Sequence, residues 1–348
     1  MPDPLRFAKA VAAAAVASVL VTLAAGLVCE RLRRAIGRQS TATTATPAGV
    51  AGVLGVCAGG ALGFHLLGDL PPRSLEGSFP DWSVGSVLDR FLVVILPFAV
   101  LVELIGAFTK APRPLVWILR LALASGAGRV LLHGSRYLLG AAGDWTVPQV
   151  WTALGGGALL LAAAWILLAW LACRRPGISL PLAISQSCLA AGMTVVLSGY
   201  LDGGAIALPL ASALAAAALA ARLREKLPAT DGAVGIGLVG LFGVLTMGRF
   251  FGELSTGRAV ALFLAPLLCW VSELPVLSQR KPWIVATVRL ALVAVPLAVV
   301  LGLAKRDFDK DMAEPYAAAQ VDCKVVIALR DLVDGRSPRN SRLNSGSR

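Results

Sequence analysis

The sequence has few charged residues, since Asp, Glu, Lys and Arg make up only 15% of its 348 positions. A soluble domain of this length carries about a quarter. Hydrophobic residues make up 57%, and they occur in long apolar blocks separated by short charged turns. Such blocks are typical of membrane-spanning helices. The composition therefore argues against a soluble enzyme, a disulfide-built secreted domain or a DNA-binding module, and we expect no nucleic-acid partner.

Motifs for catalysis and cofactor binding are absent as well. The sequence contains no Walker A motif, no G-x-S-x-G elbow and no H-E-x-x-H helix. It has two histidines and six cysteines, and no two cysteines form a C-x-x-C pair. A disulfide framework, a zinc site or a haem site is therefore not expected. We expect no metal and no cofactor, and the pattern favours a protein that is not an enzyme.

The apolar blocks predict an all-α polytopic membrane protein with about ten transmembrane helices. These form a bundle over residues 1–303, and a charged, partly disordered tail follows over residues 304–348. Each block is close to the ~20 residues that a helix needs to cross a bilayer. The predicted spans are 8–28, 48–67, 90–108, 114–138, 150–172, 178–199, 204–221, 233–251, 259–277 and 284–303.

Basic residues gather in every second turn between these blocks, beginning with Arg31, Arg33 and Arg34 after the first span. Because positive charge is retained on the cytoplasmic side, both termini are predicted to be extracytoplasmic in a cytoplasmic-type cell membrane. The basic tail after Ala304 argues against this orientation, although acidic residues offset it and long tails determine topology weakly.

Short segments of the chain resemble each other in order, which suggests an internal repeat. The copies run over about 8–138 and 204–303, with a central helix pair at about 150–199. They lie six helices apart, an even number, so the two copies have the same orientation. Parallel repeats of this kind occur in secondary transporters, with sites at the repeat interface. The matched segments are 31–34 with 222–225, 68–70 with 252–254, 103–104 with 273–274, and 120–123 with 289–292.

Each copy carries one Glu and one Arg within the membrane, on either side of a cytoplasmic turn. Glu103 and Arg120 form the first set, and Glu273 and Arg289 form the second. Antiparallel neighbouring helices would hold each Glu and Arg at one depth, so we expect two ion pairs. These residues are candidates for a substrate or proton site, because intramembrane charges are costly and usually functional. A structural clamp between two helices explains them equally well.

Further charges lie toward the predicted outer face. Arg129, His133 and Arg136 fall on one helical face and could bind an anion or a lipid headgroup. Pairing of these three with outer carboxylates is the alternative. Two sets with a spacing of four residues, His65 with Asp69 and Arg249 with Glu253, are expected to pair locally at helix ends.

These observations support three functional hypotheses. The first is a transporter or permease-like protein that moves a small solute or a lipid-linked anion by rocking of the two repeats. The second is a non-transporting membrane assembly subunit or scaffold, with partner proteins in the membrane and charges that act as clamps. The third is an intramembrane lipid-modifying enzyme, which would require the basic stripe to meet a carboxylate such as Asp69 in an open cleft. The partners expected are the lipid bilayer, a small-molecule or lipid substrate, and membrane proteins.

Overall fold

The computed structural model describes residues 4–35, 47–68, 86–108, 113–138, 145–174, 177–223, 231–273 and 281–333. Within these ranges the regular structure is entirely helical. The chain divides into two units, Met1–Leu301 and Gly302–Arg348. The helices are α1 (Pro4–Ala35), α2 (Pro47–Leu67), α3 (Val87–Arg90), η2 (Phe91–Ile95), α4 (Leu96–Phe108), α5 (Arg113–Leu132), η3 (Arg136–Leu138), α6 (Val147–Arg174), α7 (Ser179–Leu197), α8 (Leu201–Ala205), α9 (Ala207–Leu223), α10 (Asp231–Phe251), α11 (Thr256–Leu264), η5 (Ala265–Glu273) and α13 (Pro282–Val333).

Ten helical segments in the described ranges are long and apolar enough to cross a membrane, which confirms the predicted fold class. The chain is therefore a multi-pass membrane protein. Most spans are a single helix, but the third comprises α3, η2 and α4, the seventh α8 and α9, and the ninth α11 and η5. The predicted orientation of the termini remains a prediction.

The most buried helices of the first unit are α7, α9 and α10. Polar side chains of α7 connect these helices, as expected for a spanning helix rich in hydroxyl groups. Ser185 Oγ donates to the carbonyl of Ala211 on α9 at 2.7 Å, and Cys188 Sγ donates to that of Gly237 on α10 at 3.6 Å. The helix pair expected between the two repeats therefore includes one member, α7, that belongs to the core of the bundle.

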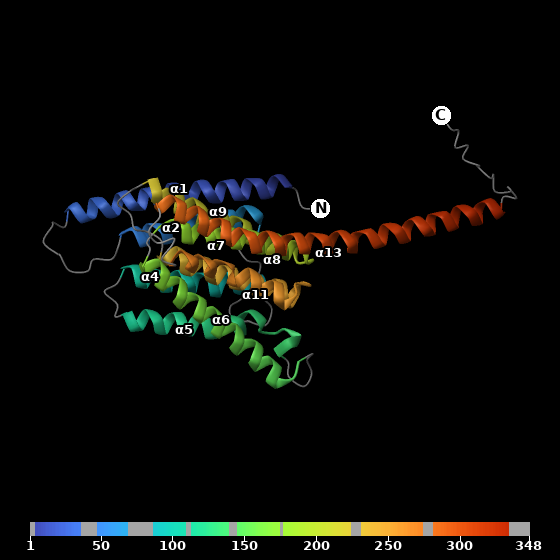
Figure 1. Cartoon of the computed structure of the whole chain (residues 1–348), viewed down its shortest axis with the longest axis horizontal. Coiled ribbons are helices and arrows are strands. Elements are labelled where there is room, and N and C mark those ends of the chain that lie inside the picture. Colours follow the sequence, from blue (N-terminus) through green and yellow to red (C-terminus); the bar gives the residue numbers. More distant parts are fainter. Residues whose placement is uncertain are drawn as a thin grey trace, which may run out of the picture. The chain divides into compact units, whose positions relative to one another are not determined.

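Helix α1 contacts α2 and α9 and lies beside them in Figure 1. Its contact face consists of small residues at intervals of four. A Cβ at Gly59 of α2 would lie 2.5 Å from the carbonyl oxygen of Ala14, so the two backbones could not approach as closely with a larger residue there. This is the small-residue packing typical of membrane helices. The small residues of α1 on this face are Ala10, Ala14, Ser18 and Thr22, all buried.

Helix α13 extends beyond the tenth span into the second unit and ends at Val333. The sequence predicts a charged, partly disordered tail from residue 304, and the part of it that the structure describes, residues 304–333, is helical. The Ser- and Arg-rich stretch after residue 334, where the sequence predicts disorder, lies outside the described residues.

Candidate functional site

Glu103 and Arg120 form an ion pair between α4 and α5, as the sequence predicts. Arg120 donates from Nε to Oε1 of Glu103 at 3.1 Å and from Nη2 to Oε2 at 2.8 Å. Two parallel hydrogen bonds of this kind are the strongest arrangement available to a guanidinium and a carboxylate. The Glu103 side chain is 2% exposed and that of Arg120 is 13% exposed. The pair is therefore largely removed from solvent and from lipid.

Three neighbouring residues enclose this pair. The guanidinium carbon of Arg120 lies 4.9 Å from the ring centre of Trp117 and 5.5 Å from that of Trp165 on α6, both within reach of a cation–π contact. On the other side, a Cβ at Gly235 would lie 2.1 Å from Oε1 of Glu103. Only glycine lets the carboxylate approach α10 this closely, near the helix N-terminus, where the backbone dipole favours negative charge.

Arg289 occupies the corresponding place in the last hairpin and joins three spans. Its Nε donates to Oγ of Ser272 on η5 at 2.7 Å, and its Nη1 donates to Oγ of Ser179 on α7 at 3.0 Å. All three side chains are buried, with Arg289 only 5% exposed. The sequence predicts Glu273 as the partner of Arg289, and this pairing stays a prediction. The residue at the spacing seen in the first pair is Ser272, 17 positions before the arginine. Glu273 is the next residue and is half-buried.

The helix type explains why Ser272 takes this place. Segment η5 is a 3-10 helix of nine residues, in which every third side chain lies on one face. Pro266, Cys269 and Ser272 form such a series and are all buried. In an α-helix, Glu273 would share the face of Pro266, because seven residues make about two turns. The 3-10 periodicity of η5 thus places Ser272 on the buried face of this segment.

Both spans that carry these residues depart from α-helical geometry at a proline. In the third span, the π-helix η2 ends two residues before Pro97, and the backbone N–H of Leu96 donates to the carbonyl of Phe91. In the ninth, Pro266 is the second residue of η5. A proline removes one backbone donor and crowds the carbonyl of the preceding turn, so the backbone adopts a different hydrogen-bond pattern. Non-α backbone therefore lies near both prolines.

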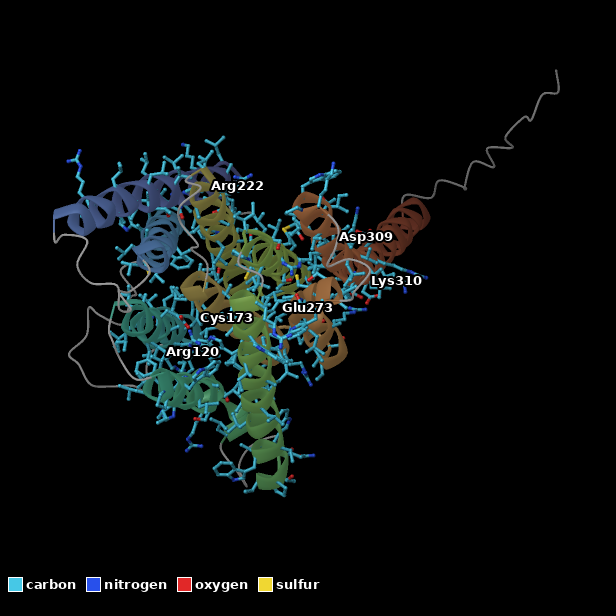
Figure 2. All side chains as sticks on the ribbon, turned by 60° about the vertical axis from the view of Figure 1, so that its left-hand side comes forward. Arg120, Cys173, Arg222, Glu273, Asp309 and Lys310 are labelled. Atoms are coloured by element: carbon cyan, nitrogen blue, oxygen red, sulfur yellow. The ribbon has the colours of Figure 1, made fainter. Side chains whose placement is uncertain are left out.

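Helix α6 contacts both the Glu103–Arg120 pair and η5, the segment that carries Ser272. Trp165 of α6 lies against Arg120, whereas Trp170 of α6 packs against Trp270 of η5, with ring centres 5.1 Å apart and the rings tilted by 56°. Figure 2 shows Arg120 and Glu273 on either side of the end of α6 that carries Cys173. The sequence places α6 outside both proposed repeats.

The basic stripe predicted on one helical face is divided by the end of α5. Arg129 lies on α5, His133 follows its last residue, and Arg136 begins the 3-10 helix η3. The helix ends because Gly134 adopts a left-handed conformation with φ of +71°, which glycine accommodates without strain. All three basic side chains are exposed, but they do not continue one α-helical face.

The structure adds one basic residue at this end of the bundle that the sequence did not single out. Arg90 donates from Nη1 to the carbonyls of Val130 and Leu131 at 3.4 and 3.3 Å, and to that of His133. It therefore caps the carboxyl end of α5, where backbone carbonyls lack helical partners. Next to it in the chain, Ser86 and Asp89 form a capping box that begins the third span.

The next residues are the two pairs expected at helix ends, Arg249 with Glu253 and His65 with Asp69. Arg249 Nε donates to Oγ1 of Thr256 at 2.6 Å, and Glu253 is exposed beyond the end of α10. Its backbone N–H bonds to the carbonyl of Ser198, which turns the chain away from the helix axis. The spacing of four residues therefore does not place Glu253 one helical turn from Arg249. His65 is exposed near the end of α2, and Asp69 lies outside the described residues.

The described ranges contain no group of three or more His, Cys, Asp or Glu side chains placed to hold a metal ion. No protein-family model matches the chain, and no curated protein and no solved structure shows significant similarity to it. The class of the molecule, a multi-pass helical membrane protein, therefore rests on its own ten spans.

Proposed function

We propose that this membrane protein moves a small solute or a lipid-linked anion. In this proposal, the Glu103–Arg120 pair and the group formed by Arg289, Ser272 and Ser179 lie where the structure changes during transport. One observation carries this proposal. Pro97, Glu103 and Arg120 are matched by Pro266, Ser272 and Arg289, each 169 positions later, and non-α backbone lies beside both prolines.

This arrangement supports transport for two physical reasons. Intramembrane charges are costly, and where they occur they commonly bind substrates, ions or protons. Secondary transporters place such sites beside interrupted helices, whose backbone can change its hydrogen bonding at a small cost. The proposal includes the internal repeat, whose two copies would move relative to each other. The first helices of the proposed copies, α1 and α9, contact each other, and so do the second helices, α2 and α10.

Reconstituted vesicles can test the proposal without a known substrate. Currents on a solid-supported membrane would be recorded after jumps of phosphate, sulfate and small carboxylates, and fluorescent anionic phospholipids would report movement of a lipid-linked anion. We expect a signal with at least one probe. It should be lost in Glu103→Gln and reduced in Glu273→Gln, and it should persist in Glu253→Gln, which changes an exposed carboxylate outside the helices. Absence of any signal, or full activity in both Glu103→Gln and Glu273→Gln, would contradict transport.

The alternative, a non-transporting assembly subunit, is favoured by the enclosure of the first pair. Trp117, Trp165 and Gly235 surround Glu103 and Arg120, as they would around a clamp that holds two helices together. This alternative predicts vesicles with no signal for any probe and a bound partner protein after gentle purification. It also predicts that replacing both charges by leucine leaves partner binding intact.

A further inference from the structure

An apolar groove lies between the second and third spans. It has a volume of about 390 Å³, within the range of small-molecule sites. Its lining consists of hydrocarbon side chains, glycine and one cysteine, with no charged or hydroxyl-bearing residue. The floor includes Phe64 of α2, Leu92 of η2 and Ile236 of α10, all buried. Such a lining would hold hydrocarbon and would not stabilise ions or a polar solute.

The groove opens toward the surroundings of the bundle. Ala61 of α2 and Pro97 and Leu101 of α4 belong to its lining and are exposed. Apolar side chains that face outward continue on both sides of this mouth, with Leu62 on α2 and Phe98 on α4. These residues lie within spans, so at membrane depth their environment is lipid. The groove is thus continuous with the lipid-facing surface of the protein.

The length of the groove fits one lipid chain. Its lining on the third span extends from Leu92 to Leu104, which corresponds to about 18 Å at the rise of an α-helix. One leaflet contributes about half of a hydrocarbon core of ~30 Å. On the α2 side, Gly60 has no side chain and Ala61 only a methyl group, which leaves room for the hollow.

We infer that this groove binds one acyl chain of a membrane phospholipid and retains it more firmly than the lipids that surround the bundle. The bound chain fills space between α2 and α4 that protein side chains leave empty. It packs against Val100 and Leu104, which flank Glu103 in the chain. The inference requires no transport activity, so it goes beyond the proposed function and can fail separately from it.

A photoreactive lipid tests this inference. The full chain would be placed in bilayer nanodiscs of phosphatidylcholine that contain a small fraction of phosphatidylcholine with a diazirine on its palmitoyl chain. Adducts would be mapped by mass spectrometry. For a retained chain we expect saturable labelling of α2 and α4. Labelling of the exposed face of α13, at Val295 and Val299, should rise in proportion to the probe. Proportional labelling at both places would overturn the inference.

A matched pair of substitutions tests the groove itself. A Cβ at Gly60 would lie 3.6 Å from the ring of Phe64, so Gly60→Leu enters the groove without a backbone collision. A Cβ at Gly156 of α6 has no atom within 4 Å, which makes Gly156→Leu the control. We expect groove labelling to fall about tenfold in Gly60→Leu, as a loss of about 1.4 kcal/mol in binding would give. The control should label like the unmodified chain.

If Gly60→Leu does not fold, Ala61→Phe at the mouth replaces it, with Leu62→Phe on the same helix as its control. Unchanged groove labelling in a folded groove variant would contradict the inference, as would equal losses in a groove variant and its control.

Discussion

The two hairpins that carry buried arginines show how helix type determines which side chain accepts the Nε hydrogen bond. Arg120 and Arg289 each lie 17 residues after the side chain that receives their Nε hydrogen bond. In the first hairpin the span is α-helical at that point, and the partner is the carboxylate of Glu103. In the second it is a 3-10 helix, and the acceptor of the Nε hydrogen bond is the hydroxyl of Ser272. The same spacing therefore provides a carboxylate acceptor in one hairpin and a hydroxyl acceptor in the other.

This difference has energetic consequences. The carboxylate of Glu103 compensates the charge of Arg120 directly, so that removal of either partner leaves a buried charge. Ser272 and Ser179 offer Arg289 hydroxyl dipoles, whose contribution to a hydrogen bond with a charged donor is smaller than that of a carboxylate. Substitutions in the first hairpin should therefore have larger effects than equivalent ones in the second.

The largest effect is expected for Glu103→Leu, which leaves the guanidinium of Arg120 without its carboxylate. Breaking a buried ion pair from one side typically costs about 3–5 kcal/mol. The double variant with Arg120→Leu should recover most of this loss, because two apolar side chains of similar volume need no compensation. Unfolding in mixed micelles with increasing dodecyl sulfate would measure both. A double variant as unstable as the single one would show that the pair is not a self-contained unit.

A smaller loss is expected for Gly235→Ala, which places a methyl group where the Glu103 carboxylate lies. Overpacking of this kind costs about 1–3 kcal/mol. Gly126→Ala on α5 is the matched control, because a Cβ there meets no atom within 4 Å. The control should be neutral or more stable by about 1 kcal/mol, as alanine favours a helix over glycine. Equal stabilities of the two variants in the same unfolding assay would indicate that the Glu103 carboxylate does not lie against Gly235.

In the second hairpin, Ser272→Ala should cost about 1–2 kcal/mol, because it removes one acceptor from a buried charged donor. Ser125→Ala on α5 removes an exposed hydroxyl that bonds only its own helix, to the carbonyl of Ala122. This control should change the unfolding free energy by no more than about 0.5 kcal/mol. A loss in Ser272→Ala that matched the one in Glu103→Leu would remove the contrast between the hairpins.

The smallest effects are expected at the ends of the spans. Thr256→Val removes the hydroxyl that accepts from Arg249, and Glu253→Gln removes an exposed charge. Exposed polar contacts contribute about 0–1 kcal/mol, so both variants should unfold close to the unmodified chain. A large loss in Glu253→Gln would indicate that its carboxylate has a structural partner after all.

Much of the fold of this protein can be predicted from the pattern of hydrophobic residues in its sequence. The ten spans and the Glu103–Arg120 pair were predicted correctly, because apolar block length and antiparallel hairpin geometry determine both. The role of Ser272 was not, since nothing in the sequence distinguishes a 3-10 from an α-helix after Pro266. One signal was present: the offset of 169 residues that relates Arg120 to Arg289 also relates Glu103 to Ser272.

Other features depend on contacts between distant segments. Ser179 reaches Arg289 from 110 positions away, so no local pattern identifies it. The stripe from Arg129 to Arg136 was predicted as one face because its spacing is helical, yet the left-handed conformation of Gly134 accompanies the end of α5. Trp117 and Trp165 enclose Arg120. In the sequence both are aromatic residues within apolar spans, and nothing there distinguishes them from tryptophans that face lipid or pack in the core.

Two double-mutant cycles measured side by side test the central claim most directly. One combines Glu103→Gln with Arg120→Gln, and the other combines Ser272→Ala with Arg289→Gln, each scored by the free energy of unfolding. Residues in contact show coupling energies of about 0.5–3 kcal/mol. We expect measurable coupling in both cycles and the larger value in the first. Strict additivity of Ser272→Ala and Arg289→Gln would contradict the account, because the 3-10 geometry would then not bring these two side chains together.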